Sequence, residues 1–320
     1  MTKGLDQPRA WVVTADMGFG HQRAAHTLSH LAEGGVLTTG TPETTDPDEA
    51  RFWHRLTWSY ELLSRTKSIP LIGPPLFSVL DGMLRIPPFY PLRDLSNPSP
   101  NNYIVDHLIR QGLGRALLER LRSRDLPLIS TFYAPCHVAD QRHAEEVYCV
   151  ICDADLNRVW VASHAERSRI RYLAPCGRVM RRLRQYGVPD EHIIITGFTL
   201  PKENIGGPGM ETLKADLLAR LGRLDPHARF TNVYGATVAE MLGDRPQPSG
   251  GRERVTVTFA IGGAGAQVEI GLMLVQALKP GILDRRFRLV LVAGVNRVLE
   301  RLIQEFVPGL DREPELGDGV

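Results

Sequence analysis

Ala10-Trp-Val-Val-Thr14 is a short apolar run, and it leads into the glycine-containing turn Asp16-Met-Gly-Phe-Gly20. Behind this turn, apolar residues recur at helical spacing between positions 21 and 31, at Ala24, Ala25, Leu28 and Leu31. A strand, a tight turn and a helix in this order are typical of the opening of a doubly wound domain, in which helices cover a parallel sheet. The sequence therefore predicts an α/β fold that begins at this strand.

Strands and helices continue to alternate after this opening. The predicted strands lie at 35–39, 126–132, 146–152, 159–162 and 193–197, and the predicted helices at 46–64, 102–124 and most of 163–186. The segment 68–100 interrupts the alternation, because it is apolar and holds too many prolines for one long helix. We expect residues 1–200 to form one Rossmann-like lobe with an insertion at 68–100.

A second opening of the same kind follows later in the chain. Helices are predicted near 210–221 and 232–242, and a Pro/Gly-rich linker at 244–251. Beyond it the predicted order is a strand at 254–261, the turn Gly262-Gly-Ala-Gly265, a helix at 267–278, a strand at 287–293 and a helix at 295–305. We expect residues 201–250 to connect the first lobe to a second Rossmann-like lobe at 251–320. That lobe is incomplete, because a whole one needs roughly five or six strands and about 150 residues.

The composition is ordinary for a globular protein, with 43% hydrophobic and 23% charged residues. A net charge of +2 is too small to indicate nucleic acid as a partner. Residues 1–9 are polar and lack the apolar core of a signal peptide, and no apolar run reaches the roughly 18 residues of a membrane-spanning helix. We therefore expect a cytoplasmic protein.

Two local clusters each leave two interpretations open. Cys149 and Cys152 have the spacing of a metal or redox pair, but residues three apart on a strand point to opposite faces, so reduced, buried thiols are the better interpretation. A cluster of arginines has two interpretations. It is either a solvated helix face or a binding surface for an anionic partner, which would be a phosphate or an acidic membrane surface. Its members are Arg167, Arg169, Arg171, Arg178, Arg181, Arg182 and Arg184.

The two glycine turns are suited to binding anions. Glycine lets the backbone approach a ligand closely, and the helix N-terminus behind each turn favours a phosphate or a developing oxyanion. His21 follows Gly20 at the carboxyl end of a predicted strand, which is where open α/β sheets bind ligands. Histidine side chains titrate near neutral pH and suit a general base. A capping or packing role for His21, and a plain tight turn at each glycine cluster, are the alternatives.

Four stretches of the chain resemble one enzyme family. Ala15-Asp-Met-Gly-Phe-Gly-His-Gln-Arg-Ala-Ala-His-Thr-Leu28 is similar to the N-terminal signature of the monogalactosyldiacylglycerol synthases and the related bacterial diacylglycerol glucosyltransferases. Asp153-Ala-Asp-Leu-Asn-Arg-Val-Trp160 resembles their Asp-aromatic-x-x-His-x-x-Trp element. Tyr186-Gly-Val-Pro189 with Ile194-Ile-Thr-Gly197 resembles the strand leading to the second lobe, and Phe259-Ala-Ile-Gly-Gly-Ala-Gly265 resembles the donor-side glycine loop.

The resemblance implies two Rossmann-like lobes of the GT-B type. It implies an inverting transfer of a sugar from a nucleotide diphosphate donor, such as a UDP-sugar, to a hydroxyl of a lipid or other hydrophobic acceptor. His21 would be the base that deprotonates this hydroxyl, and Asp153 a second candidate catalytic residue. The acceptor-side residues would be Gly18, Gly20 and Trp160, and the residues facing the donor diphosphate would be Gly262, Gly263 and Gly265. His137 is a further acceptor-side candidate because it follows the end of the predicted strand at 126–132. The resemblance implies no metal ion and no cofactor, and a peripheral contact with anionic membrane. It also implies that 68–100 is an insertion that docks the acceptor and the membrane, and a packed cap on the first lobe is the alternative for this segment.

Two features favour other functions on the same fold. Asn157 stands where the family has histidine, and Asp155 adds a charge beside it. Only about 70 residues follow the linker, from Gly251 to Val320, so the family's ribose-binding acidic residue would lie beyond the sequence. Either the sequence is a fragment or donor binding has been lost. A non-catalytic GT-B-like binding protein and a sugar-nucleotide epimerase that uses Asp16 and Asp153 are therefore the alternatives to the transferase.

Overall fold

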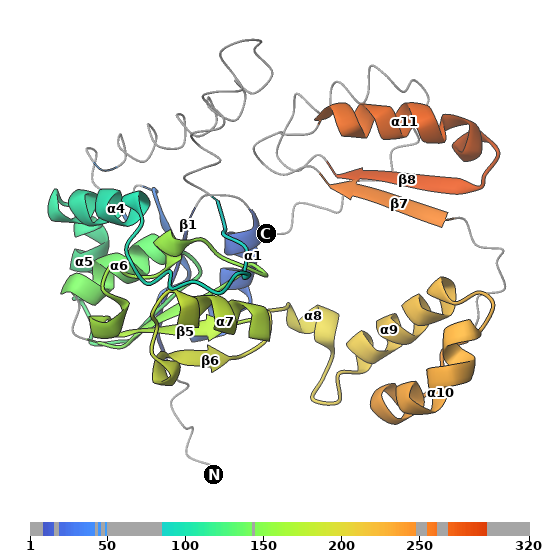
Figure 1. Cartoon of the computed structure of the whole chain (residues 1–320), viewed down its shortest axis with the longest axis horizontal. Coiled ribbons are helices and arrows are strands. Elements are labelled where there is room, and N and C mark those ends of the chain that lie inside the picture. Colours follow the sequence, from blue (N-terminus) through green and yellow to red (C-terminus); the bar gives the residue numbers. More distant parts are fainter. Residues whose placement is uncertain are drawn as a thin grey trace. The chain divides into compact units, whose positions relative to one another are not determined.

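The computed structural model describes residues 9–15, 19–41, 44–45, 49, 85–142, 145–247, 255–260 and 268–292. The chain divides into two compact units, Met1–Asn204 and Ile205–Val320, and Figure 1 shows the elements of each. Most of the predicted helix at 46–64, residues 68–84 of the predicted insertion and the predicted helix at 295–305 lie outside the described residues.

The N-terminal unit is built on a parallel sheet whose six described strands follow the order β2-β1-β3-β4-β5-β6. They are β1 (Trp11–Ala15), β2 (Leu37–Thr39), β3 (Leu128–Ser130), β4 (Val147–Val150), β5 (Ile170–Ala174) and β6 (Ile193–Ile195). In register, β1 pairs Val13 with Leu37 on one side and with Ser130 on the other. The predicted α/β class, with a Rossmann-like parallel sheet, is confirmed.

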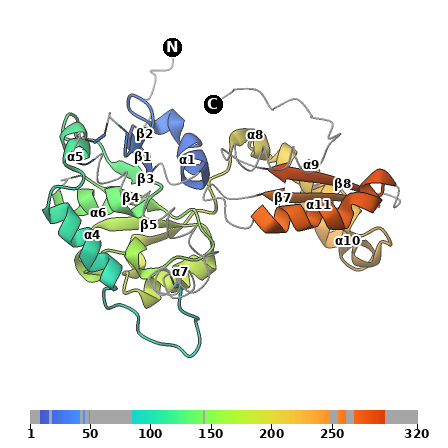
Figure 2. The same ribbon diagram turned by 90° about the horizontal axis from the view of Figure 1, so that it is seen from above.

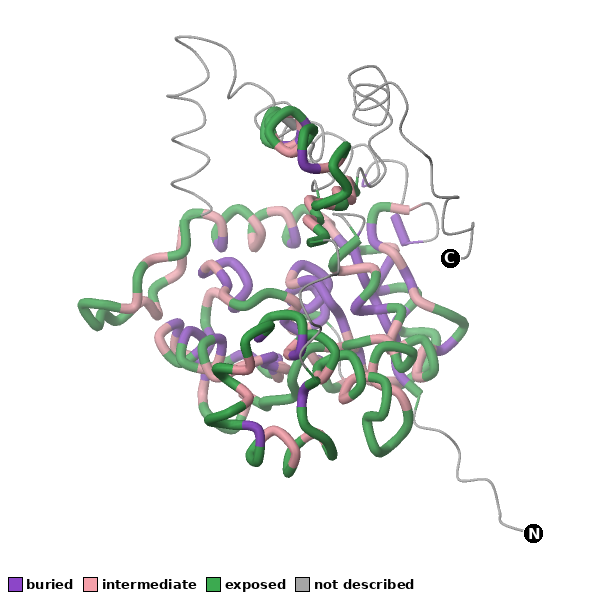
Figure 3. The backbone as a smooth tube through the Cα atoms, turned by 90° about the vertical axis from the view of Figure 1, so that its right-hand side faces the viewer, coloured by how far each residue is buried: buried purple, intermediate pink, exposed green. Residues whose placement is uncertain are grey.

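Helices cover this sheet and bury its side chains. They are α1 (Phe19–His26), α4 (Pro100–Arg110), α5 (Arg115–Leu121), α6 (Tyr133–Arg142) and α7 (Gly177–Gln185), with 3-10 turns η1 (Ser29–Leu31), η2 (Arg158–Trp160), η3 (Ala165–Arg167) and η4 (Asp190–His192). Helix α1 packs on β1, α6 packs on β3 and β4, and α7 packs on β5 and β6 (Figure 2). The buried residues form one core that follows the strands and the inward helix faces (Figure 3).

Two predictions for the region 159–186 are wrong. Residues 159–162 are not a strand, because Arg158–Trp160 form the turn η2. The strand of this region is β5, which lies in a stretch predicted as mostly helical. In β5, buried and half-buried residues alternate with the period of two that a strand requires, and it pairs with β4 along its length.

The predicted helix at 102–124 is two helices, because the chain turns at Gly112 and Gly114. Gly114 is the N-cap of α5 and has a φ of 79°, in the left-handed region that glycine adopts most easily. A Cβ atom at this position would lie 2.6 Å from Cγ1 of Val138 on α6. The glycine thus permits both the turn and the close packing of α5 on α6.

We expect Gly114→Ala to lower the free energy of unfolding by about 3 kcal/mol, since left-handed strain and the overlap with Val138 add together. Gly35 is the matched control, because its φ is 99° but no atom lies within 4 Å of the added Cβ. Gly35→Ala should therefore cost only the backbone strain, about 1–2 kcal/mol. Urea denaturation of both variants checks this, and equal losses would contradict the packing argument.

The C-terminal unit contains a helical pair and a β-α-β segment. The helices are α9 (Glu211–Leu224) and α10 (Arg229–Leu242), preceded by the short α8 (Lys202–Ile205) at the boundary of the units. Strands β7 (Val255–Ala260) and β8 (Phe287–Val292) pair in parallel, and α11 (Val268–Leu283) connects them and packs on β8. The two strands and the helix between them match the predicted order, and the predicted glycine turn at 262–265 lies outside the described residues. None of the helices in the described part of the chain combines the length and apolar character that crossing a membrane requires.

Candidate functional site

His21 lies at the point where the order of the strands reverses. The chain leaves β1 through α1 to β2 on one side, and β3 then pairs with β1 on the other side. His21 is in the first turn of α1, and its Nδ1 lies 2.8 Å from the carbonyl oxygen of Thr131, the residue after β3. The contact therefore spans the carboxyl ends of β1 and β3, the topological switch point at which open α/β sheets bind ligands.

This contact fixes which ring nitrogen of His21 carries the proton when the ring is neutral. A carbonyl oxygen only accepts hydrogen bonds, so Nδ1 of His21 must donate to Thr131. Neutral imidazole carries one ring proton, and with that proton on Nδ1 the lone pair is on Nε2. The side chain is half-buried, which leaves part of the ring accessible to a ligand. The ring is thus held in one orientation, with Nε2 able to accept a proton.

Thr131 holds the start of α1 to the sheet through a second contact. Its hydroxyl donates to the carbonyl oxygen of His21 at 3.0 Å and lies 2.9 Å from the hydroxyl of Thr14, in β1. Thr14 and Thr131 are both buried, so these bonds are shielded from water. His21 is thus anchored by its backbone and by its ring to the same residue.

Aromatic rings form a wall beside the His21 ring. The ring centroid of His21 lies 5.3 Å from that of Phe132 and 5.9 Å from that of Trp160. Tyr133 closes the wall behind them, with its centroid 5.5 Å from that of Trp160. Phe132 is 6% exposed and Trp160 is 7% exposed, so the wall belongs to the hydrophobic core and packs against the imidazole.

His137 lies next to this site but inside the core. It is 2% exposed within α6, and its Nε2 lies 3.4 Å from the carbonyl oxygen of Trp160. Burial lowers the pKa of His137, although the contact with the Trp160 carbonyl opposes the shift. His137 is therefore a neutral side chain that packs against the Tyr133 ring and contacts the carbonyl oxygen of Trp160.

The remaining predicted site residues make no side-chain contact with His21 among the described residues. Asp153 is exposed in the loop after β4, and no hydrogen bond joins it to His21 among the described residues. Gly20 is exposed in the first turn of α1, and a Cβ atom there would meet nothing within 4 Å. Gly18 and the three donor-side glycines, Gly262, Gly263 and Gly265, lie outside the described residues.

The cysteines near the site are free thiols. Cys149 is buried in β4 and Cys152 is half-buried after it, and neither forms a disulfide. Burial raises the pKa of Cys149 well above its ordinary value, and burial together with the nearby charge of Asp153 raises the pKa of Cys152 to about 12. Both thiols are therefore protonated at neutral pH. Among the described residues, no three His, Cys, Asp or Glu side chains gather as metal ligands would.

Sequence reasoning missed the residues that shape the loop carrying Trp160. Asn157 caps η2, since its side chain accepts a hydrogen bond from the backbone N–H of Val159. The guanidinium of Arg158 is buried and donates to the carbonyl oxygens of Ser96 and Val161, each at 2.7 Å. A cavity of about 510 Å³ lies beside this turn, and its lining includes Asn157 and Arg158 but not His21. Arg158 lies two positions before Trp160 in the sequence, and this proximity is the signal that could have pointed to its role.

Comparison of the chain with protein-family models, with curated proteins and with solved structures finds no match.

Proposed function

We propose that this protein is an inverting glycosyltransferase of the GT-B type, which moves a sugar from a nucleotide diphosphate donor to a hydroxyl of a hydrophobic acceptor. The observation that carries the proposal is the orientation of His21, whose Nδ1–H donates to the Thr131 carbonyl across the switch point and whose Nε2 keeps its lone pair. The position of this histidine after the first strand also agrees with the sequence resemblance.

The proposed step is a single displacement. The acceptor hydroxyl donates to Nε2 of His21, its oxygen attacks the anomeric carbon of the donor, and the bond from that carbon to the diphosphate breaks. The proton passes to Nε2, and the nucleotide diphosphate leaves with the bonding electrons. A well-placed general base contributes about 10²–10⁴ to the rate of such a step. Phe132 and Trp160 pack beside the His21 ring and hold it in place for this step.

Other parts of the proposal come from the resemblance. The second lobe would hold the donor, a UDP-sugar, with Gly262, Gly263 and Gly265 at its diphosphate. Strands β7 and β8 with α11 would be part of that lobe. The acceptor would be a lipid or another hydrophobic hydroxyl compound, bound from the cytoplasmic side of an anionic membrane.

A transfer assay tests the proposal. The full-length protein is incubated with labelled UDP-glucose or UDP-galactose, and with diacylglycerol in mixed vesicles, and the label is followed in lipid and in free sugar. Label in the lipid fraction is the expected result. Donor that is cleaved to free sugar in the absence of acceptor would also show a functional donor site. Donor that binds without turnover would favour a non-catalytic binding protein and would contradict the transferase.

A further inference from the structure

A second pocket lies on the outer face of α7. Its volume is about 600 Å³, and its lining includes three arginines of this helix, Arg178, Arg181 and Arg184. The opposite side of the pocket is apolar and is formed by Phe89, Tyr90 and Leu92. The three arginines are spaced by three residues, which brings consecutive ones onto neighbouring positions of the helix surface.

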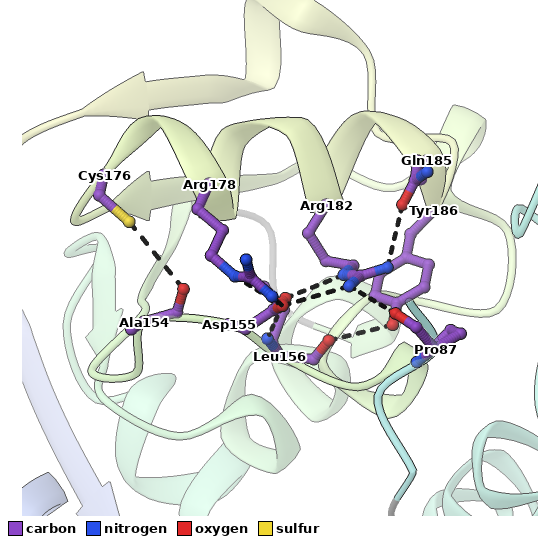
Figure 4. Close-up of polar contacts among 9 residues, drawn as sticks. All are labelled: Pro87, Ala154, Asp155, Leu156, Cys176, Arg178, Arg182, Gln185 and Tyr186. Carbon is purple, nitrogen blue, oxygen red and sulfur yellow. Dashed lines mark hydrogen bonds and ion pairs between the residues drawn. The ribbon is translucent and has the colours of Figure 1, made fainter. Parts of the chain in front are cut away.

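Buried contacts hold the two sides of the pocket together (Figure 4). The side chain of Arg182 is fully buried, and its Nε donates to Asp155 at 2.8 Å while its Nη2 donates to the carbonyl oxygen of Pro87 at 2.7 Å. Its guanidinium carbon also lies 4.0 Å from the ring centroid of Phe89. The segment that carries Phe89 is therefore fixed against α7, and the pocket exists before a ligand arrives.

The arginines of this pocket have more positive charge than their partners neutralise. Arg178 pairs with Asp155 at 2.8 Å, and Arg184 pairs with Asp190 at 2.6 Å. Arg181 is exposed, and within the described residues it makes no ion pair with a carboxylate. Its guanidinium carbon lies 5.7 Å from the centroid of Phe89. Among the described residues, the four guanidinium groups of α7, including Arg182, form ion pairs with two carboxylates, Asp155 and Asp190, which leaves an excess of two positive charges.

The apolar side of the pocket is open to a ligand. Tyr90 is 77% exposed and Leu92 is 74% exposed, although both lie next to the arginines. Large apolar side chains exposed beside a cluster of charges indicate a surface that a partner covers. A ligand for this pocket thus combines an anionic group with an apolar or aromatic one.

We propose that this pocket binds a phosphate-bearing ligand with an apolar substituent. The phosphate dianion matches the two excess charges, and its oxygens accept hydrogen bonds from Arg181 with Arg178 and Arg184 on either side. The apolar substituent covers Tyr90 and Leu92. The pocket is separate from the His21 site, because its lining includes neither His21, Thr131 nor Trp160. The ligand is either a soluble phosphate compound or the headgroup of a lipid.

Direct binding to the full chain tests this assignment without any assay of transfer. Phenyl phosphate is titrated by calorimetry at low ionic strength, and saturable binding with one site is expected, tighter than the binding of inorganic phosphate. Arg181→Gln should weaken it about tenfold, which corresponds to about 1.4 kcal/mol. Arg122→Gln is the matched control, because Arg122 is an exposed arginine outside this pocket, and it should bind like the wild type.

Three results would overturn the proposal. They are an unchanged affinity in Arg181→Gln, an equal loss in Arg122→Gln, and the absence of saturable binding at millimolar phenyl phosphate. Because Arg181 is exposed, Arg181→Gln should melt like the wild type, so that a loss of binding reports on the pocket itself.

Co-sedimentation with phosphatidic acid vesicles, compared with phosphatidylcholine vesicles, distinguishes a lipid headgroup from a soluble phosphate compound as the ligand. Sedimentation that depends on Arg181 identifies a lipid headgroup, and binding of phenyl phosphate alone identifies a soluble ligand.

Discussion

His21→Asn is expected to lower the rate of glycosyl transfer by a factor of about 10²–10⁴. The asparagine amide nitrogen reaches roughly the position of Nδ1, so it still donates to the Thr131 carbonyl. Asparagine has no counterpart of the Nε2 lone pair, however, and cannot take the acceptor proton. The variant thus removes the base and keeps the anchor, and the assay measures labelled sugar recovered in the acceptor.

The same helix supplies the control for this experiment. His26 is exposed at the last position of α1, and His26→Asn should transfer at the wild-type rate. Both variants should melt close to the wild-type temperature. Wild-type transfer by His21→Asn would exclude His21 as the base. Loss of transfer together with a collapse in stability would mark His21 as a packing residue.

Arg182→Met is expected to lower the free energy of unfolding by about 3 kcal/mol. Arg182 is completely buried in the N-terminal unit, and it connects Asp155, Pro87 and Gln185. Methionine fills much of the same volume, but it leaves these acceptors without their donor and Asp155 with one cation fewer. The loss lies near the lower end for a broken buried ion pair, because Arg178 still pairs with Asp155.

Arg178→Met is the matched variant for this comparison. It removes a second arginine from the same carboxylate, but the side chain of Arg178 is 55% exposed. Exposed ion pairs contribute about 0–1 kcal/mol, so this variant should be nearly as stable as the wild type. Urea denaturation of both measures the difference. Equal stabilities would show that the Arg182 contacts do not hold the segment at Pro87 to α7.

The Arg182 contact also predicts how stability depends on pH. Burial alone would raise the pKa of Asp155, but hydrogen bonds from Arg182 and the Leu156 backbone, with the charge of Arg182, hold it below its ordinary value. A carboxyl whose pKa falls on folding stabilises the protein above its unfolded pKa, about 3.9. This stabilisation is lost as the pH falls through the lower folded value. Arg182→Met should therefore lose less stability than the wild type between about pH 5 and about pH 2.

The sequence predicts the local elements of this fold better than its long-range contacts. The apolar run in β1 and the turn before His21 are local signals, and they place the first strand and helix correctly. The hydrogen bond from His21 to Thr131 joins residues 110 positions apart, and no spacing in the sequence predicts it. The site was therefore predictable as a residue type at a strand end, but its tautomer and its aromatic wall were not.

The arginine-rich region shows why sequence patterns fail where charge is buried. Arg182 belongs to a segment that is typical of a solvated helix face, yet it is the largest fully buried side chain of the described residues. Its partner Asp155 lies 27 positions away, so a local pattern cannot reveal the pair. Likewise Val159 and Trp160 form an apolar run that resembles a strand, but Asn157 and Arg158 supply the contacts of a 3-10 turn.

Nitrogen NMR of the His21 ring tests the central claim most directly, because it needs no knowledge of the substrate. The account predicts that the neutral ring carries its proton on Nδ1, where it donates to the Thr131 carbonyl, and that Nε2 is unprotonated. The assignment is made by comparing the wild type with His21→Asn at a pH where the ring is neutral. A neutral ring protonated on Nε2 would contradict the account, since Nδ1 would then have no proton to donate and Nε2 no lone pair to accept one.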